Sequence, residues 1–468
     1  MATPVRKEHD AYGTVELPAE CLYGLNTARA VEYFDFSGRT LGDEPGLVAG
    51  FAAVKQAAAA ANRRTGCLDA ERADAIVRAC DDMRSGRLSD WLVVDLLEGA
   101  GGTSLNMNVN EVLANAAIVR LGGNPGDYAR VHPNDHVNRS QSTNDVVPSA
   151  ISLGCHTAAG DLIGVLDELA GALTARQAEF SAILRLGRTC FQDAQPMTVG
   201  QAFGAYAAGA ARARDRLAAA RSDLLVLPLG ATAIGTGYGA PPGYREAVFD
   251  ALRGTTGLDV VPAEDLFDAL SNADGFVRFS GELAAAASVL GKIATDLITL
   301  SSGPAGGVGE LRLPQLQAGS SIMPGKVNPV VPMALRQIAH AVAGANATVI
   351  AAATDGLHEI NHNEPLIAYE LLSSLRLLQR GTALLARQCI RGITVDEERT
   401  RLNLRSSPAI GTTLAGERGY GRATELVQRA AAENRPLADL LIEAGEYTEA
   451  ELDALIRDAV AGGADEAE

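Results

Sequence analysis

Helical periodicity that continues past 25 residues is the feature of this sequence that most limits its fold. Apolar residues recur at helical spacing in Val147 to Phe180, Gly200 to Leu224, Ala263 to Ser301, Met333 to Thr354 and Pro365 to Cys389. Such long patterns are typical of long-helix bundles, coiled coils or membrane helices. The sequence lacks sustained heptads, and no uncharged apolar run approaches the roughly 18 residues of a membrane span. We therefore predict a mainly α protein with a central bundle of long helices.

Rods of this length also predict self-association. A helix of about 40 residues spans about 60 Å at 1.5 Å per residue. Long helices with small alanine faces commonly bury those faces against other subunits. We therefore expect a homo-oligomer.

The composition agrees with helices and excludes several classes of partner. Of 468 residues, 47% are apolar and only 4% aromatic, with alanine and glycine filling the chain. Lysine and arginine number 40 against 57 aspartate and glutamate, a net charge of −17. This charge repels polyanions, so we expect neither nucleic acid nor an anionic membrane as a partner. An anionic substrate must then meet a locally basic site.

Cysteine usage and the first residues indicate the compartment. Six cysteines lie far apart without a CxxC pair: Cys21, Cys67, Cys80, Cys155, Cys190 and Cys389. Reduced thiols fit this pattern better than a disulfide framework. The first residues, MATPVRKEHD, have no secretory signal core. We expect a soluble, cytoplasmic protein.

Three domains are expected along the chain. Residues 1–144 begin with a short hairpin and continue as a mixed, mostly helical domain. Residues 145–392 carry the long helices. Residues 393–468 have shorter helical patterns and form a small helical domain.

Four polar segments interrupt the helical pattern. They are GAGGTSLNMNVNE (99–111), NRSQSTND (138–145), GRTCFQDAQPMTVGQ (187–201) and GSSIMPGKVNP (319–329). Each alone has a structural explanation, because Thr103, Ser142 and Thr143 can cap helices and Lys326 can be a solvated lysine. Together they supply the serine, threonine, asparagine and lysine donors that two carboxylates require.

These segments resemble a known family. GSSIMPGKVNP, SQSTND, GTSLNMN, LGATAIGTG (229–237) and SSGPAGGVGEL (301–311) are similar to the aspartase/fumarase superfamily, nearly end to end. YGLNTARAVEYF and KVNPVVP resemble its aspartate ammonia-lyase branch. The resemblance implies a cofactor-free, homotetrameric lyase whose active sites are each built from three subunits. It also implies reversible anti elimination from a C2-substituted succinate to give fumarate.

The resemblance also assigns roles. Ser320 is the expected general base and Lys326 the expected catalytic anchor of a carboxylate. The carboxylate that becomes the aci form is expected to meet Thr103, Ser142, Thr143 and Ser321. Thr189 and Asn328 hold the other carboxylate with Lys326, Asn144 lies beside the leaving group, and Cys190 and Met323 complete the substrate-binding set. A serine base needs its alkoxide stabilised, which a glycine-rich loop with free N–H groups can provide. We expect this loop to act as a mobile lid.

Two positions depart from the family pattern. Fumarases and aspartases have histidine where this chain has Cys190, and glutamate where it has Met333. The resemblance implies that these two residues pair in fumarases. Without a titratable partner, a weakly basic leaving group such as nitrite is favoured. We therefore predict a nitrosuccinate lyase that releases fumarate and nitrous acid, with L-aspartate ammonia-lyase as the alternative.

Two readings belong to other classes. HEINH (358–362) matches the HExxH zinc motif, in which two histidines one helical turn apart bind the metal. Pro365 follows closely, and Pro365 and Ala368 occupy the Gly and His places of the metzincin extension, so we expect no metal. The second is a non-catalytic structural relative, against which Ser320, Lys326 and Asn328 argue.

Overall fold

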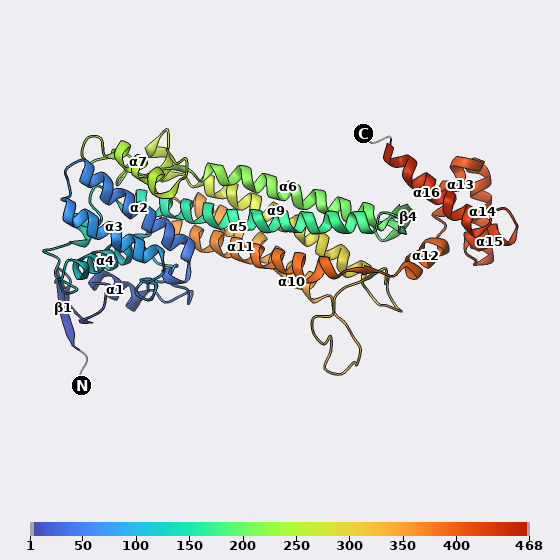
Figure 1. Ribbon diagram of the computed structural model, residues 1–468, viewed down its shortest axis with the longest axis horizontal. Helices are drawn as coiled ribbons and strands as arrows, with labels where there is room; N and C mark the ends of the chain where they lie inside the picture. Colours follow the sequence, from blue (N-terminus) through green and yellow to red (C-terminus); the bar gives the residue numbers. More distant parts are fainter. Residues whose placement is uncertain (1–3, 466–468) are drawn as a thin grey trace. The chain divides into compact units, whose positions relative to one another are not determined.

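The structure is a computed structural model that describes residues 4–465 (Figure 1). It divides into two compact units, each assembled from three separate segments of the chain. Unit 1 comprises Met1–Ile163, Asp215–Ala285 and His340–Leu378; unit 2 comprises Gly164–Arg214, Ala286–Ala339 and Gln379–Glu468. Helices dominate both units, so the expected mainly α class is confirmed. The division into domains 1–144, 145–392 and 393–468 stays a prediction.

Unit 1 begins with the expected hairpin and continues as helices. Its elements are β1 (Val5–Asp10), β2 (Gly13–Pro18), α1 (Leu25–Tyr33), α2 (Pro45–Arg64), α3 (Ala70–Arg84), α4 (Thr103–Arg120), β5 (Val226–Leu227), α7 (Tyr244–Thr256), β6 (Val261–Pro262) and α8 (Leu266–Ser271). Strands β1 and β2 pair antiparallel, with Val5 opposite Pro18. Strands β5 and β6 form a short parallel pair.

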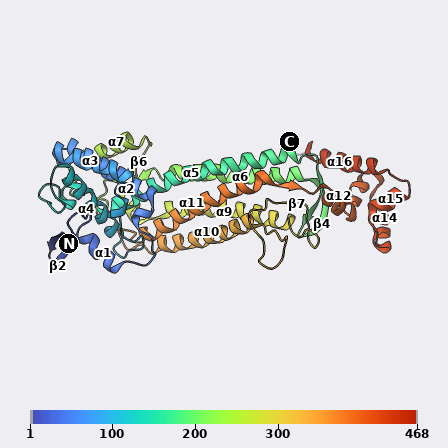
Figure 2. The ribbon, with the colours of Figure 1, turned by 60° about the horizontal axis from the view of Figure 1, so that its bottom comes forward.

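Five long helices contribute residues to both units. They are α5 (Thr143–Glu179), α6 (Val199–Asp223), α9 (Asp274–Leu300), α10 (Val330–Thr354) and α11 (Glu364–Leu384). In unit 2, α6 lies beside α5 and α9 (Figure 2). A Cβ at Gly204 would meet the Gln177 side chain at 2.8 Å, so a small residue permits this approach.

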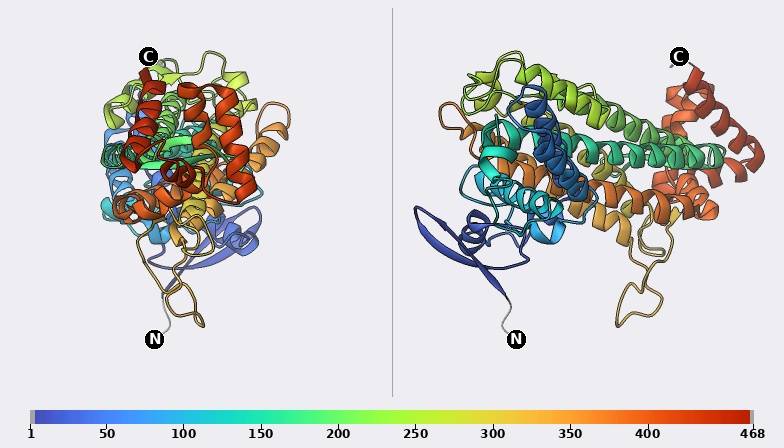
Figure 3. Two further views of the ribbon diagram at one scale, coloured as in Figure 1. Left: turned by 90° about the vertical axis from the view of Figure 1, so that its right-hand side faces the viewer. Right: turned by 60° about the vertical axis from the view of Figure 1, so that its left-hand side comes forward.

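Unit 2 adds a hairpin and the C-terminal helices. Its other elements are β3 (Leu184–Thr189), β4 (Gln192–Thr198), β7 (Leu311–Arg312), β8 (Thr394–Val395), α12 (Glu397–Ser406), α13 (Ile410–Arg418), α14 (Tyr420–Glu433), α15 (Leu437–Glu443) and α16 (Glu449–Asp465). The C-terminal helices share one apolar core that also includes Leu186 of β3. Residues 313–329 extend from this unit as a loop (Figure 3).

One expected helix is divided. The periodic segment Ala263 to Ser301 forms α8 and α9, with Asn272 in an extended conformation between them. Asp265 caps α8 by accepting the N–H groups of Phe267 and Asp268. The Asn272 side chain donates back to Asp268 at 2.6 Å. These local polar contacts therefore interrupt the helix, although the spacing of apolar residues continues through the break.

Among residues 4–465, two helices, α5 and α9, are long and apolar enough to cross a bilayer by length and composition alone. The apolar window of α5 is 67% buried inside the protein, as in a core helix, whereas that of α9 is only 44% buried. Most of the other residues of α9 are half-buried, so part of its apolar surface is open to solvent in the single chain.

Candidate active site

The first two polar segments meet in unit 1. The Glu98 carboxylate accepts the N–H groups of Ala100 and Gly102, which folds the glycine-rich segment back on itself. Gly102 has a φ of 88°, and a Cβ there would lie 2.9 Å from Val147 Cγ2. Only glycine permits this approach. Thr103 thereby begins α4 directly beside the first turns of α5.

Side-chain hydrogen bonds join the two segments further. Asn106 Nδ2 donates to Thr143 Oγ1 and to Asn138 Oδ1, both at 3.2 Å. Asn144 Nδ2 donates to the Ala233 carbonyl at 2.7 Å, and Ser142 Oγ accepts the Asn144 N–H. We call Thr103, Asn106, Ser142, Thr143 and Asn144 the unit 1 cluster. The structure thus brings four of the predicted substrate-binding residues together.

Two buried charges support this cluster. Asp145 is fully buried and accepts the N–H groups of Ser142, Gly230 and Thr232 at 2.9 to 3.1 Å. Lys55 is also fully buried, and its Nζ donates to Asn138 Oδ1 at 2.9 Å and Gln141 Oε1 at 3.1 Å. Both therefore fix the backbone that flanks Ser142 and Thr143.

Burial dominates the titration of both groups. It raises the pKa of the Asp145 carboxyl to about 6, although the three backbone donors and Lys55 act in the opposite direction. It lowers the pKa of the Lys55 amine to about 7, with the Asp145 charge opposing. Each group depends on the other, because an isolated charge in this position is costly.

Sequence reasoning missed Lys55 and Asp145 as supporting residues. A signal exists for Lys55, which is the only charged residue in the apolar stretch GLVAGFAAVKQAAAAA (46–61). Such a lysine is rarely buried without a partner. The sequence does not indicate the burial of Asp145, because an aspartate in the first turn of a helix is common for structural reasons alone.

The third polar segment forms the β3–β4 hairpin of unit 2. Thr189 pairs with Gln192, so Cys190 and Phe191 occupy the turn. Both turn residues lie in the left-handed region, with φ of 52° and 61°. We call residues 189–192 the hairpin tip. Its Cys190 side chain is exposed.

The fourth segment, residues 319–329, is called here the glycine loop. Ser320 Oγ accepts the backbone N–H groups of Ile322 at 3.2 Å and Met323 at 3.1 Å. Two hydrogen bonds join the ends of the loop, which we call its neck. The Gly319 N–H donates to the Lys326 carbonyl, and Asn328 Nδ2 donates to the Gly319 carbonyl. Donors aimed at Ser320 Oγ are the arrangement that stabilises an alkoxide.

The hairpin tip and the glycine loop do not meet within unit 2. Met323, Lys326 and Asn328 line a cavity of about 570 Å³. Neither Thr189 nor Cys190 belongs to its lining. Within residues 4–465, no hydrogen bond or ion pair joins the hairpin tip to the glycine loop, and Ser321 lies exposed. The hairpin tip and the glycine loop are therefore separate within unit 2.

The zinc reading of HEINH fails on geometry. Leu357 pairs with Ile360 in an isolated bridge, and His358 has a φ of 56°. Helix α11 starts only at Glu364. His358 and His362 therefore do not lie one turn apart on a helix, as the motif requires. Among the described residues no cluster of three potential ligands forms.

Known structures share this fold over nearly the whole chain. A crystal structure of fumarate lyase:delta crystallin from Brucella melitensis, bound to cobalt, is 41% identical with a TM-score of 0.94, covering 97% of this chain and 100% of that one. A class II fumarase from Schistosoma mansoni is 32% identical with a TM-score of 0.90, covering 97% and 98%. The fold is therefore that of a lyase of this class.

Sequence comparison gives the family. The family model described as Lyase matches residues 13–344. Aspartate ammonia-lyase from Pseudomonas fluorescens is 44% identical over 457 residues, which are 97% of this chain and 96% of that protein. The enzyme of the same name from Escherichia coli K12 is 39% identical over 454 residues, 97% and 95%. The chain therefore belongs to the aspartase/fumarase superfamily of lyases, as a carbon–nitrogen lyase.

Proposed function

We propose that the chain eliminates ammonia from L-aspartate to give fumarate. The observation that carries this proposal is the 44% identity to an aspartate ammonia-lyase over 97% of the chain. The relatives thus favour the alternative reading of the sequence over the nitrosuccinate prediction. The nitrosuccinate reading keeps only the support of Cys190 and Met333, which give the leaving group no histidine or glutamate partner.

The proposed base is Ser320. Its Oγ already accepts two backbone N–H groups, which stabilise the alkoxide that takes the proton from C3 of the substrate. Loss of this proton puts two negative charges on the adjacent carboxylate. Thr103, Ser142, Thr143 and Ser321 are proposed to donate to that aci form. Lys326, with Asn328 and Thr189, holds the second carboxylate.

Ammonia leaves without a separate acid. The amino group is bound as –NH₃⁺, so the electrons of the C–N bond pass to nitrogen and neutral NH₃ departs. The proton held by Ser320 then balances the products as fumarate and ammonium. Asn144 is proposed to orient the amino group. Neither Cys190 nor Met333 needs to supply a proton in this scheme, which reconciles their presence with a deaminating enzyme.

The active site is proposed to be completed across subunits of a homotetramer. Within unit 2 the hairpin tip and the glycine loop are separate, whereas the chemistry requires both, together with the unit 1 cluster, around one substrate. The 44% buried window of α9 supports self-association, because an apolar helix face favours cover by another subunit. Solubility and a cytoplasmic location stay predictions from the sequence.

One assay separates the two leaving groups. Fumarate absorbance is followed with L-aspartate and with nitrosuccinate, side by side, on the same enzyme preparation. We expect faster turnover of L-aspartate, with ammonia as the second product. Turnover of nitrosuccinate with release of nitrite, and none of L-aspartate, would reverse the choice. Turnover of neither would support the non-catalytic reading.

The base is tested by Ser320→Ala. Loss of kcat by at least about 10³-fold is expected, because the group that accepts the C3 proton is removed. Ser222→Ala is the matched control, since its exposed Oγ contacts only the Ala218 carbonyl of its own helix. Equal rates in wild-type and Ser320→Ala protein would assign the base elsewhere. Unchanged thermal unfolding in both variants excludes misfolding as the cause.

A further inference from the structure

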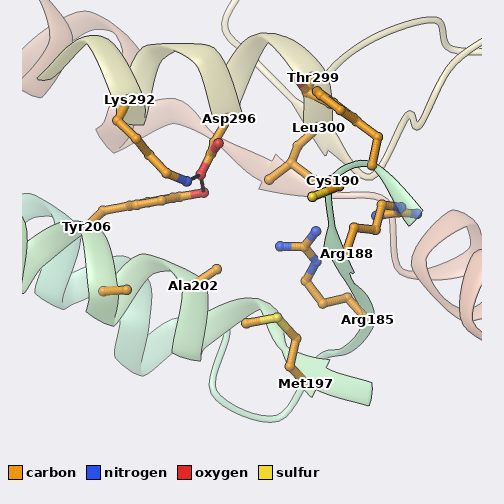
Figure 4. Close-up of a pocket in the computed structure, with 12 residues that line it drawn as sticks. Arg185, Arg188, Cys190, Met197, Ala202, Tyr206, Lys292, Asp296, Thr299 and Leu300 are labelled. Atoms are coloured by element: carbon orange, nitrogen blue, oxygen red, sulfur yellow. Dashed lines mark hydrogen bonds and ion pairs between the residues drawn. The ribbon is translucent and has the colours of Figure 1, made fainter. Parts of the chain in front are cut away.

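A second cavity in unit 2 lies beneath the hairpin tip, apart from the glycine loop. It has a volume of about 380 Å³ and shares only Cys190 with the predicted substrate-binding residues. Figure 4 shows Arg185, Cys190 and the group Tyr206, Lys292 and Asp296 bordering its interior. We call it the hairpin cavity.

Arg185 is the unusual group in this cavity. Its side chain is only 8% exposed, and its Nε donates to Glu310 Oε2 at 3.1 Å. Its two terminal nitrogens have no partner among residues 4–465, and in Figure 4 the guanidinium points into the cavity. A guanidinium carries five N–H donors, and those on the terminal nitrogens of Arg185 face the cavity and its solvent instead of a protein acceptor. A charged acceptor in the cavity would replace that solvent with a charge-assisted pair.

The charge of the cavity is unbalanced. The Glu310 carboxylate is shared between Arg185 and Arg188, the latter at 2.8 Å. One carboxylate therefore faces two guanidinium groups. On the opposite wall Asp296 pairs with Lys292 and also accepts the Tyr206 hydroxyl at 2.8 Å, so that wall is neutral. The surplus positive charge belongs to the Arg185 side.

Much of the remaining lining is apolar, although Thr299 also lines the cavity, with its hydroxyl donating to the Thr295 carbonyl. Met197, Ala202 and Leu300 face the same cavity as Arg185. These side chains offer no donors to the further oxygens of a phosphate or sulfate. A planar carboxylate can instead take both terminal nitrogens of Arg185 and lay a short hydrocarbon chain on the apolar wall.

We propose that the hairpin cavity binds a small monocarboxylate, anchored by Arg185. The bound molecule contacts the wall that carries Cys190, next to the predicted substrate residue Thr189. The site is independent of the leaving group of the proposed reaction. It is also distinct from the cavity that contains Lys326 and Asn328.

The test uses butyrate, which lacks the second carboxylate of a succinate-like substrate. Full-length protein is titrated calorimetrically with sodium butyrate, with n-butanol as a neutral probe of similar size and with sodium chloride at matched ionic strength. We expect saturable heat with butyrate alone. Arg185→Met should abolish it, because the anchor is removed.

A second variant protects the test against misfolding of Arg185→Met. Ala205 is exposed on α6 and lines the cavity, so Ala205→Leu fills the space while leaving the Arg185–Glu310 pair intact. Butyrate should bind about tenfold more weakly or worse in this variant. Ala208→Leu is the matched control, since Ala208 is exposed on the same helix outside the cavity lining. Butyrate should bind it as it binds wild-type protein.

Alkylation of Cys190 locates the bound butyrate. Its sulfur faces the cavity in Figure 4, so saturating butyrate should slow its reaction with iodoacetamide, while Cys67 in unit 1 reacts as before. Equal responses to butyrate and chloride, or equal butyrate binding in wild-type and Ala205→Leu protein, would show that the cavity holds only water.

Discussion

The unit 1 cluster and the glycine loop present similar donors but support them differently. The cluster rests on Lys55 and Asp145, both fully buried, and on hydrogen bonds between segments distant in sequence. The glycine loop holds Ser320 through its own backbone, and its Ile322 is 83% exposed. The comparison teaches that one half of the proposed site is set by folding, whereas the other can move without disturbing a core.

The largest expected effect tests the buried half. Lys55→Met should lower the free energy of unfolding by about 3–5 kcal/mol, because the side-chain oxygens of Asn138 and Gln141 lose their charged donor and buried Asp145 loses an opposite charge. The double variant Lys55→Met/Asp145→Asn should lose less than the sum of the two single losses. Urea unfolding measures all three, with Lys7→Met as a surface control, since Lys7 has 68% of its side chain exposed. Additive losses would show that the two charges do not interact.

The pH dependence of stability sharpens the same point. Burial raises the pKa of Asp145 from 3.8 unfolded to about 6 folded. Between these values the folded state binds the extra proton, so this group's contribution to stability falls as pH rises from about 4 to 6. The free energy of unfolding of wild-type protein, relative to Asp145→Asn, should fall by about 3 kcal/mol over that window. A constant difference across it would assign Asp145 an ordinary pKa.

The neck of the glycine loop gives a smaller effect, on activity alone. A Cβ at Gly319 would lie 2.2 Å from the Lys326 carbonyl oxygen, so Gly319→Ala must open the neck. We expect kcat/KM for L-aspartate to fall about tenfold to a hundredfold, because Ser320 and Lys326 lose their spacing. Gly306→Ala is the matched control, since a Cβ there meets nothing within 4 Å. The thermal unfolding temperature should stay unchanged in both variants. A lower temperature for Gly319→Ala would show that the glycine loop contributes to the stability of the core.

The smallest expected effect is at the tip of the loop. Ile322→Ser should change the free energy of unfolding by no more than about 0.5 kcal/mol, because the side chain is exposed. KM for L-aspartate should rise if closure of the loop covers Ile322. A stability loss above about 1 kcal/mol would show that the assembled protein already buries this side chain.

The long helices were predictable because their apolar period is local. Gly200 to Leu224 was expected and α6 spans Val199–Asp223; Met333 to Thr354 was expected and α10 spans Val330–Thr354. The spacing of apolar residues did not predict the break at Asn272 between α8 and α9, where polar side chains form hydrogen bonds that end the helix. The expected segment Pro365 to Cys389 is helical to its end, but its last five residues, Leu385–Cys389, form a π-helix that the apolar period did not distinguish from α11.

The predicted substrate-binding residues could be found from sequence motifs, but the buried residues that hold them in place could not. Ser320, Thr103 and Thr143 stand in recognisable segments. Lys55 and Asp145 lie 90 positions apart, and nothing in either segment specifies the other. The separation of the hairpin tip from the glycine loop within unit 2 was equally hidden, since the order of motifs along the chain does not determine which of them meet in space.

The backbone of the hairpin tip has a consequence for how this position can change over evolution. Cys190 has a φ of 52°, a region that β-branched side chains rarely tolerate and that asparagine, aspartate and histidine enter more readily. Exchange of histidine for cysteine preserves that conformation, whereas valine, isoleucine or threonine would have to bend the turn. The backbone of the tip therefore limits which residues can replace Cys190. A new substrate preference at this position has to come from residues that are not branched at Cβ.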